Sequence, residues 1–504
     1  MALKVQTSTL KGRPRSPTIA FWLYNGLDAA VTHEIHEKIA SQLDEVTSAT
    51  YEFERMMQGP AMTLMTRGIR VDLAMRDRVR DAYALDLEGV EGNLNTKANA
   101  IWQKPLNPRS SPQVGSFFYD TMGIPEIFNH KPGKGDVRTC DRAALETIHK
   151  ENKETRPFID LIFQAREITK KRSVLKSGLD ADGRMRCSYN IGGTKGARWS
   201  SSSNAFHGGT NHQNLEDLIR RIFIPDPGFK MVYSDLDRAE SMCVAFLAQD
   251  DAYKEAHRAH DMHALAASWL FDVAEADADK TKVYRHFTYR DLTKRGGHLL
   301  NYGGTPWGLA RALHISVDLA REFEKRYFRT FPGIRNRYHK QVARQLKASG
   351  RITTHLSRRR AFFQRRDDPT TLRDAYSYEP QSLVAEILNI GLHRTWSGLD
   401  GNNVRILANV HDAILWEVDE TANDTANSDI NPFRKTSQEL IESVEHLMAV
   451  PLTIHGDTMT IPVSSTAGYN WGKLAADNPC GLTDFGSDLE RAQRRPETTP
   501  VLHN

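Results

Sequence analysis

Two aspartates stand where apolar, strand-like runs of this sequence end. The run FKMVYSD ends at Asp235, and in VRILANVHDAILWEV two apolar runs flank His411 and Asp412. The second pattern predicts a β-hairpin that carries His411 and Asp412 at its tip. If the two strand ends converge, Asp235 and Asp412 offer the oxygen ligands that a pair of Mg²⁺ ions needs for in-line phosphoryl transfer. Taken alone, an aspartate at a strand end is more often a cap, a turn residue or a surface charge.

A third segment supplies positive charge. The sequence YRDLTKRGGHLLNYGG places Arg290, Lys294, His298 and Tyr302 at four-residue steps, which puts them along one helix face over about 18 Å. Fixed cations bind a triphosphate, and a ring on the same face can stack on a base. The alternative is a solvated basic helix, but the four glycines of this segment make it a poor helix for structural work alone.

Composition limits what must position these residues. A chain of 504 residues predicts about three domains. The content of 39% hydrophobic and 26% charged residues is typical of a globular protein. The net charge is only +4, although basic clusters occur, as at Arg358, Arg359 and Arg360, and such clusters suit a phosphate backbone.

Cysteine spacing and hydropathy indicate the compartment. The four cysteines lie far apart without a C-x-x-C pair, which argues against a disulfide framework and a zinc ribbon. No stretch approaches the length needed to span a membrane. We expect a cytoplasmic protein with no membrane partner, in the host cytoplasm if the source is viral.

Periodicity divides the chain into lobes. Residues 1–18 read as a basic tail, and helical patterns follow over about 20–71, 73–101 and 142–176. The two strand-like segments bracket a mostly helical insertion at about 252–349, and a tail ends the chain. The aspartates are therefore expected on one sheet, with the cationic helix on the lobe inserted between its strands.

These motifs, in this order, resemble family A DNA polymerases, the group of bacterial polymerase I and related phage enzymes. The family's D-Y-S-x-x-E-L-R is matched by DLDRAESM, which aligns Asp235 and Glu240. Its R-x-x-x-K-x-x-x-[FY]-x-x-x-Y-G is matched from Arg290 to Gly303, and its V-H-D-E is matched by VHDA. GARWSSSSNAFHGGTNHQNL and DMHALAA also have counterparts, so the resemblance covers more than 400 residues.

The resemblance implies an α+β right-hand polymerase fold with a helical thumb, an antiparallel β-sheet palm and helical fingers. The expected divisions are a basic tail with a remnant of an exonuclease-domain helix (1–44), the thumb (45–184), the first part of the palm (185–251), the fingers (252–369), the second part of the palm (370–475) and a C-terminal tail (476–504).

The resemblance also implies a DNA-templated DNA polymerase that extends a primer 3′ end with dNTPs by two-metal phosphoryl transfer. Asp235, Asp412 and the backbone carbonyl of Leu236 would hold two Mg²⁺ ions, for which Mn²⁺ can substitute, and Lys294 would donate a proton to pyrophosphate. The expected nucleotide-binding residues are Arg290, Lys294, His298, Tyr302, His263 and Glu240. The expected contacts to primer-template DNA are Arg198, Gln381, Arg373, His411, Asn211, Gln213 and Asn214.

Three departures from the family pattern stand at the expected site. Ala413 replaces the acid beside the second metal aspartate, and His298 replaces a phenylalanine or tyrosine. Asp237 replaces a serine and is read as a helix N-cap. These changes put metal affinity, rate and nucleotide selectivity in question.

The N-terminal YNGLD, with Tyr24 and Asp28, resembles the last motif of the family's proofreading exonuclease, but no Asp or Glu precedes Asp28. We therefore expect no proofreading by this chain alone, in a phage enzyme of replication or repair. Further candidate partners are a separate exonuclease chain and a processivity factor. Two other readings stay open: a single-subunit RNA polymerase, against which Glu240 and Tyr302 argue, and a catalytically weakened DNA-binding replication factor, which Ala413 favours.

Overall fold

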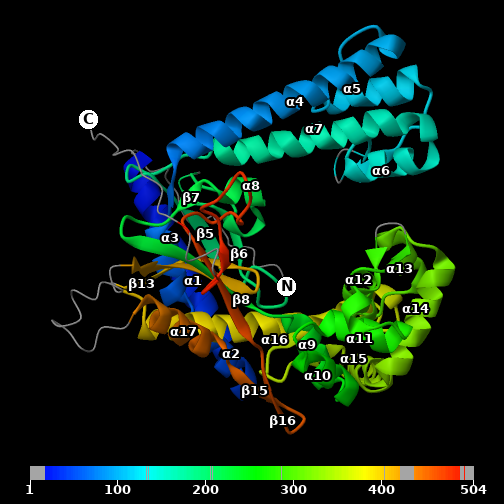
Figure 1. Ribbon diagram of the computed structural model, residues 1–504. Helices are drawn as coiled ribbons and strands as arrows, with labels where there is room; N and C mark the ends of the chain where they lie inside the picture. The colour runs from blue at the N-terminus through cyan, green and yellow to red at the C-terminus, as the bar shows by residue number, and fades with distance from the viewer. Residues whose placement is uncertain are drawn as a thin grey trace.

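The computed structural model describes residues 17–131, 133, 135–204, 206, 208–284, 287–401, 403–420, 436–487 and 493. A central antiparallel sheet lies between a long helical hairpin and a compact helical lobe (Figure 1). The expected α+β class is confirmed. Most of the two expected tails, residues 1–16 and nearly all residues after 487, lies outside the described part of the chain.

The central sheet has the strand order β13-β14-β8-β17-β18, and all of its neighbouring strands are antiparallel. The predicted strand ending at Asp235 is β8, which lies in the middle of the sheet and extends one residue further, to Leu236. Ser234, at the sheet centre, accepts a hydrogen bond from the indole of the buried Trp416 at 3.0 Å. The strands are β8 (Phe229–Leu236), β13 (Val404–Val410), β14 (Ala413–Asp419), β17 (Val463–Gly468) and β18 (Thr483–Asp484).

Helix α17 packs on β14 and β17 of this sheet, and the long helix α16 packs on α17. The helix α16 carries Pro380 in its interior, where the missing N–H and the ring disturb the backbone ladder of a helix. Its residues are largely buried because it contacts α9, α17 and α15. These helices are α9 (Ala239–Leu247), α15 (Lys340–Ser349), α16 (Pro369–Gly398) and α17 (Ser437–Met448).

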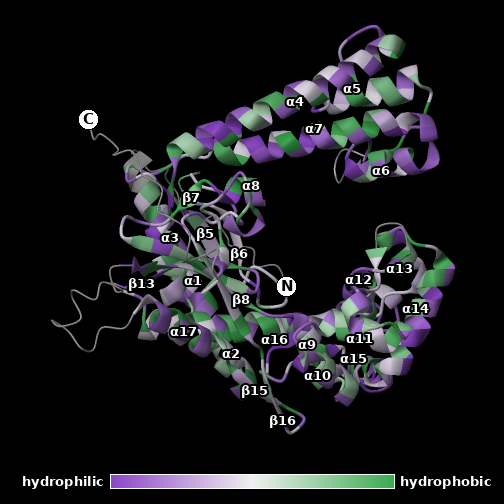
Figure 2. Cartoon of the chain, viewed as in Figure 1, coloured by the Kyte–Doolittle hydropathy of each residue, from purple (hydrophilic) through white to green (hydrophobic). Residues whose placement is uncertain are grey.

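The helical hairpin consists of α4 and α7 packed side by side (Figure 1). Asp72 caps α4 by accepting the Met75 N–H at 2.9 Å. The buried residues of α4 recur every three or four positions, which makes one apolar stripe. Hydrophilic and hydrophobic residues alternate along both helices in Figure 2. The far end has its own core around Phe117, Phe118 and Phe158. The elements are α4 (Leu73–Trp102), α5 (Ser111–Gly115), β2 (Phe128–Lys131), β3 (Gly135–Arg138), α6 (Arg142–Glu151) and α7 (Arg156–Leu175).

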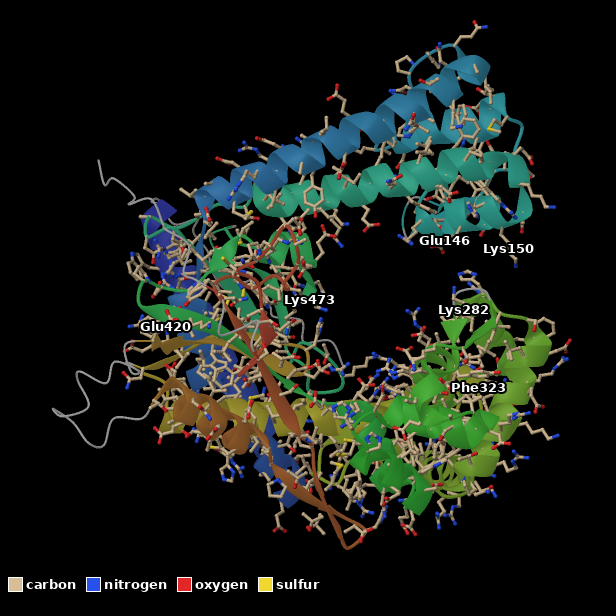
Figure 3. The ribbon with its side chains drawn as sticks, in the orientation of Figure 1. Glu146, Lys150, Lys282, Phe323, Glu420 and Lys473 are labelled. Atoms are coloured by element: carbon tan, nitrogen blue, oxygen red, sulfur yellow. The ribbon has the colours of Figure 1, made fainter. Side chains whose placement is uncertain are left out.

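The helical lobe is the predicted insertion, and α12 is its cationic helix. A Cβ on Gly296 would lie 2.4 Å from the ring of Phe323, and one on Gly297 would lie 3.2 Å from Tyr327. Phe323 points into the lobe interior (Figure 3). These two glycines therefore have a packing role, so they do not by themselves distinguish α12 from a purely structural helix. The helices are α10 (Asp251–Arg258), α11 (Met262–Phe271), α12 (Tyr289–Asn301), α13 (Pro306–Leu313) and α14 (Val317–Thr330).

Among the N-terminal helices, α3 contacts strand β13 of the sheet and helix α16. In α3, Thr63 accepts a hydrogen bond from the Trp396 indole at 2.9 Å, and Arg67 pairs with Asp400 at 2.7 Å. None of the described helices is long and apolar enough to cross a bilayer. These helices are α1 (Pro17–Ala40), α2 (Glu45–Met56) and α3 (Gln58–Arg67).

The remaining short elements are helix α8 and the strands of small two- and three-stranded sheets. They are β1 (Ile69–Val71), β4 (Arg184–Met185), β5 (Cys187–Asn190), β6 (Ser200–Ser203), α8 (Asp217–Arg220), β7 (Phe223–Ile224), β9 (Lys282–Tyr284), β10 (Phe287–Thr288), β11 (Arg351–Thr353), β12 (Arg359–Ala361), β15 (Pro451–Ile454) and β16 (Asp457–Thr460).

Candidate active site

A cavity of about 890 Å³ separates the end of β8 from helix α12. One wall carries carboxylates from the sheet and the start of α9, and the other carries cations from α12. Its lining includes Asp235, Leu236, Asp237, Glu240, His263, Arg290, Lys294, His298 and Asp412.

The two aspartates meet at the edge of this cavity. The predicted hairpin is confirmed, because Val410 pairs with Ala413 and leaves His411 and Asp412 as a two-residue turn. Asp235 stands opposite Ala413 in the β8–β14 register, and the Leu236 N–H donates to the Asp412 carbonyl at 3.1 Å. Main-chain pairing therefore brings the two predicted aspartates together.

The turn itself is strained at His411, whose φ is +59°. A two-residue hairpin turn needs a positive φ at its first position, which glycine or asparagine adopts most easily. A histidine held there costs on the order of 1–3 kcal/mol, and such residues cluster at functional sites.

Burial and mutual repulsion govern the charges of the aspartates. Burial, and then the nearby charges of Asp412 and Asp237, raise the pKa of Asp235 to about 7. Burial also raises the pKa of Asp412, which Arg198 and His411 partly offset. The described residues contain no preformed set of three or more metal-ligating side chains. A divalent cation would nevertheless stabilise the ionised form of two neighbouring carboxylates whose pKa values are raised, and both carboxylates are suitable oxygen ligands for it.

Glu240, in the first turn of α9, is the centre of a cluster. Its carboxylate accepts hydrogen bonds from the Arg198 guanidinium and the Tyr302 hydroxyl. His298 Nδ1 lies 4.0 Å from Glu240 Oε2, and its ring meets that of Tyr302 edge to face at 5.0 Å. Burial and the Glu240 charge raise the pKa of Tyr302 strongly, so this phenol stays a hydrogen-bond donor. The cluster fixes the Glu240 carboxylate within the cavity lining.

The cationic wall follows the predicted four-residue pattern except at Tyr302, which is the C-cap of α12 and is not part of the cavity lining. Arg290, Lys294 and His298 all lie within α12 and line the cavity. Arg290 Nε donates to Asp261 Oδ2 at 2.6 Å, and Asp261 also caps α11. Burial, and then the charges of Lys294 and Arg290, lower the pKa of His263 to about 4, which keeps this imidazole neutral.

Several residues expected to contact DNA lie beyond the cavity, at the loops beside β13. Asn211 accepts the Gln213 N–H at 2.9 Å, and Gln213 Nε2 donates to the Asn409 side chain at 3.4 Å, two residues before His411. Asn214 is exposed and lines a separate cavity of about 540 Å³ at the base of α7.

Two others lie on α16. Arg373 donates to Thr370 Oγ1 at 3.1 Å and lies beside Gly303, and the half-buried Gln381 follows Pro380. The structure thus distributes the expected DNA contacts over β-loops and α16, on elements that flank the carboxylates. Their roles stay predictions.

Asp237 does not have the place that we expected. The N-cap of α9 is Arg238, which makes no side-chain capping bond, so the reading of Asp237 as an N-cap was wrong. Its N–H donates to the Pro462 carbonyl at 2.9 Å, and its Oδ1 accepts the Ser464 hydroxyl at 2.9 Å. Strand β17, far away in sequence, therefore holds this residue.

Sequence reasoning missed Asp261, which orients Arg290. Its signal was available, because an aspartate directly before the apolar MHALAASWLF has the typical position of an N-cap. Its second role needed the tertiary contact with α12.

Residues 80–472 match the family model described as DNA polymerase family A. The thermostable DNA polymerase I of Thermus aquaticus is 25% identical over 420 residues, which are 80% of this chain and 47% of that protein. DNA polymerase I of Chloroflexus aurantiacus is 24% identical over 477 residues, 90% of this chain and 46% of that protein. The chain thus spans about half the length of these curated relatives.

Among solved structures, the POL domain of Pol1 from M. smegmatis, in a complex with DNA primer-template and dNTP, matches with a TM-score of 0.65. The identity is 24%, and the match covers 83% of this chain and 70% of that one. The central sheet, the helical hairpin and the helical lobe accordingly form the expected right-hand fold, with palm, thumb and fingers. With the family model matching most of its length, this chain belongs to DNA polymerase family A.

Proposed function

We propose that this chain is a DNA-directed DNA polymerase that extends a primer 3′ end with dNTPs. The observation that carries the proposal is one cavity lined by two half-buried aspartates, Asp235 at the end of β8 and Asp412 in the neighbouring hairpin turn, and by the cations of α12. Membership of family A supports it, as does the likeness to a POL domain that binds primer-template and dNTP. The activity of these relatives stays a proposal for this chain, because the chain spans about half of their length.

The cationic wall would bind the triphosphate of the incoming dNTP. Arg290, already aligned by Asp261, offers a planar fork for phosphate oxygens, and Lys294 offers a point charge one helical turn along. The neutral His263 can donate one further hydrogen bond. Lys294, which lines the cavity, would also donate a proton to the departing pyrophosphate.

Glu240 would select the sugar. Its carboxylate is held from two sides by Tyr302 and Arg198, so it cannot easily move aside for a ribose 2′-hydroxyl. His298 lies next to both Glu240 and Tyr302, with more than half of its side chain exposed. This leaves the ring able to stack on the base or sugar of the nucleotide.

Asp235, Asp412 and the backbone carbonyl of Leu236 would hold two Mg²⁺ ions, which Mn²⁺ can replace. When bound, such ions activate the primer hydroxyl and neutralise charge on the leaving phosphates. The chain contributes a frame for them, because Asp235 lies in the central strand β8 and the carbonyl of Asp412, in the turn before β14, accepts the Leu236 N–H.

The primer-template would lie against the loops beside β13 and against α16. Arg198 and Gln381 would test the minor-groove acceptors that all correct base pairs share. His411, Asn211, Gln213, Asn214 and Arg373 would position the strands by polar contacts. Binding should weaken steeply with salt.

Primer extension tests this function. On a defined primer-template with Mg²⁺, the wild-type chain should add dNTPs in template order and rNTPs far less. Asp235→Ala and Asp412→Ala should each abolish addition while leaving the thermal unfolding transition in place. A folded wild-type chain that adds no nucleotide under any metal or salt condition would remove the proposal.

We further propose that this chain serves phage replication or repair and has no proofreading of its own. The support is that, within residues 1–504, the family's exonuclease pattern is matched at Tyr24 and Asp28 alone. A mispaired 3′ end incubated with enzyme and Mg²⁺, without dNTPs, should stay undegraded; its removal at a rate abolished by Asp28→Ala would contradict this. A separate exonuclease chain or a processivity factor would be detected by its effect on the length of the primer-extension products.

A further inference from the structure

Asp237 lies on the same face of the sheet as Asp235. Leu236 is the last residue of β8 and pairs with Val463. The ladder continues one step further, because the Asp237 N–H donates to the Pro462 carbonyl at 2.9 Å. In an extended strand, residues two apart point to the same face. Asp235 and Asp237 accordingly both line the cavity.

Strand β17 orients the Asp237 carboxylate without neutralising it. Ser464 stands opposite Asp235 in the register, and its hydroxyl reaches diagonally to Asp237 Oδ1 at 2.9 Å, as cross-strand neighbours on one face do. Within the described residues, Asp237 forms no ion pair with a lysine or arginine. The Asp237 charge instead acts on two other carboxyls, those of Asp235 and Glu445.

On the opposite side of Asp235, the residue that pairs with it in β14 carries no charge. There the register partner is Ala413, whose side chain is fully buried. The charges that act on Asp412 come from Arg198, His411 and Glu240. Asp237 is thus on the β17 side of Asp235, and Asp412 is on the β14 side.

We propose that Asp237 supplies the third carboxylate of the divalent-cation site, from the β17 side of Asp235. On the β14 side, position 413, where the family has an acid, is Ala413 in this chain. The proposal rests on the proposed function for its two-aspartate site. Under this proposal, two departures from the family pattern are related: the acid that is absent at Ala413 is replaced by the acid at Asp237, on the other side of Asp235. An uncompensated carboxylate that faces a site for dications is stabilised when they bind.

The test measures metal binding on the folded chain without DNA or nucleotide. Asp237→Asn keeps an oxygen that accepts from Ser464 but removes the charge. We expect it to weaken Mn²⁺ binding, followed by calorimetry or by the loss of the free Mn²⁺ electron paramagnetic resonance signal, by about 10-fold. Asp235→Asn is the reference loss. Asp251→Asn, at a side chain that is 97% exposed and outside the cavity, is the matched control and should bind like the wild type.

Thermal unfolding separates a metal role from a purely structural one. Without metal, Asp237→Asn should melt at the wild-type temperature or above, because it relieves repulsion among like charges, and its Mn²⁺-induced stabilisation should be reduced. Asp237→Glu should recover part of the Mn²⁺ affinity. Ser464→Ala, which retains the charge, should weaken Mn²⁺ binding less than Asp237→Asn does.

Unchanged Mn²⁺ affinity in Asp237→Asn, beside a clear loss in Asp235→Asn, would overturn the inference and leave the polymerase proposal intact. A lower melting temperature with unchanged Mn²⁺ affinity would likewise overturn it, in favour of a structural turn. If instead Mn²⁺ binding depends on Asp237 but the wild type extends no primer, the third carboxylate stands and the proposed function falls.

Discussion

The two walls of the cavity are built by different means. The acidic wall is held by main-chain hydrogen bonds: Asp235 lies in the central strand β8, and the Asp412 carbonyl accepts the Leu236 N–H. The basic wall is held by side chains: Arg290 by Asp261, and Tyr302 by Glu240. Helix α12 packs closely against Phe323 at Gly296, which has no side chain.

This difference separates the residues that supply the chemistry from the residues that hold them in position. On the acidic wall, replacing a side chain removes a charge but leaves the backbone frame that presents it. On the basic wall, replacing a partner that never touches the substrate displaces a residue that does. Mutations on the two walls should therefore have opposite signatures in activity and stability.

The largest effect should come from Asp412→Asn, which tests the acidic wall. Primer extension should fall by about 10³-fold or more, because a metal ligand contributes several kcal/mol to the transition state. Stability should not fall. The folded-state pKa of Asp412 is raised, so its ionised form opposes folding, and this cost grows as pH rises through that pKa. At pH 8 the melting temperature should equal or exceed that of the wild type, and a clear drop would mean that the side chain also holds the frame.

Gly296→Ala should show the reverse signature on the basic wall. Its Cβ would lie 2.4 Å from the Phe323 ring, so α12 must shift, at a cost of about 1–3 kcal/mol in unfolding free energy. Gly92→Ala in α4, where nothing lies within 4 Å, is the control and should stabilise by about 0.4–1 kcal/mol. Urea unfolding measures both. Equal effects in the two variants would refute close packing as the reason for Gly296.

Asp261→Asn should raise the dNTP KM by about 10-fold with little change in kcat, because Arg290 loses a charge-assisted partner while asparagine can still cap α11. Steady-state extension kinetics measure the split. A fall in kcat with unchanged KM would show that Arg290 acts in the chemical step instead.

The smallest effect should follow Tyr302→Phe. It removes one of the two hydrogen bonds that hold Glu240, so discrimination between dNTP and rNTP should fall by about 5-fold. The ratio of the two kcat/KM values reports it. Unaltered discrimination would show that Arg198 alone is sufficient to hold the Glu240 carboxylate in position.

Local patterns gave the elements of the site correctly. Alternation and apolar runs located β8 and the β13–β14 turn, and four-residue steps located α12. These are short-range signals, since strand and helix periodicity follow from backbone geometry. The same reasoning failed at Asp237, because a strand end and a helix start carry similar local signals and only the pairing with Pro462 distinguishes them.

The sequence by itself determined which residue types are present and on which elements they lie: two aspartates at strand ends, a cationic helix face, and an alanine and an aspartate at the two departures. Only the tertiary structure decided which of them meet. It set Ala413 and Ser464 on opposite sides of Asp235, joined Asp261 to Arg290, and closed Arg198 and Tyr302 on Glu240. The physical reason is that strand register and helix packing are fixed by hydrogen bonds and buried contacts across the whole chain, which no local window contains.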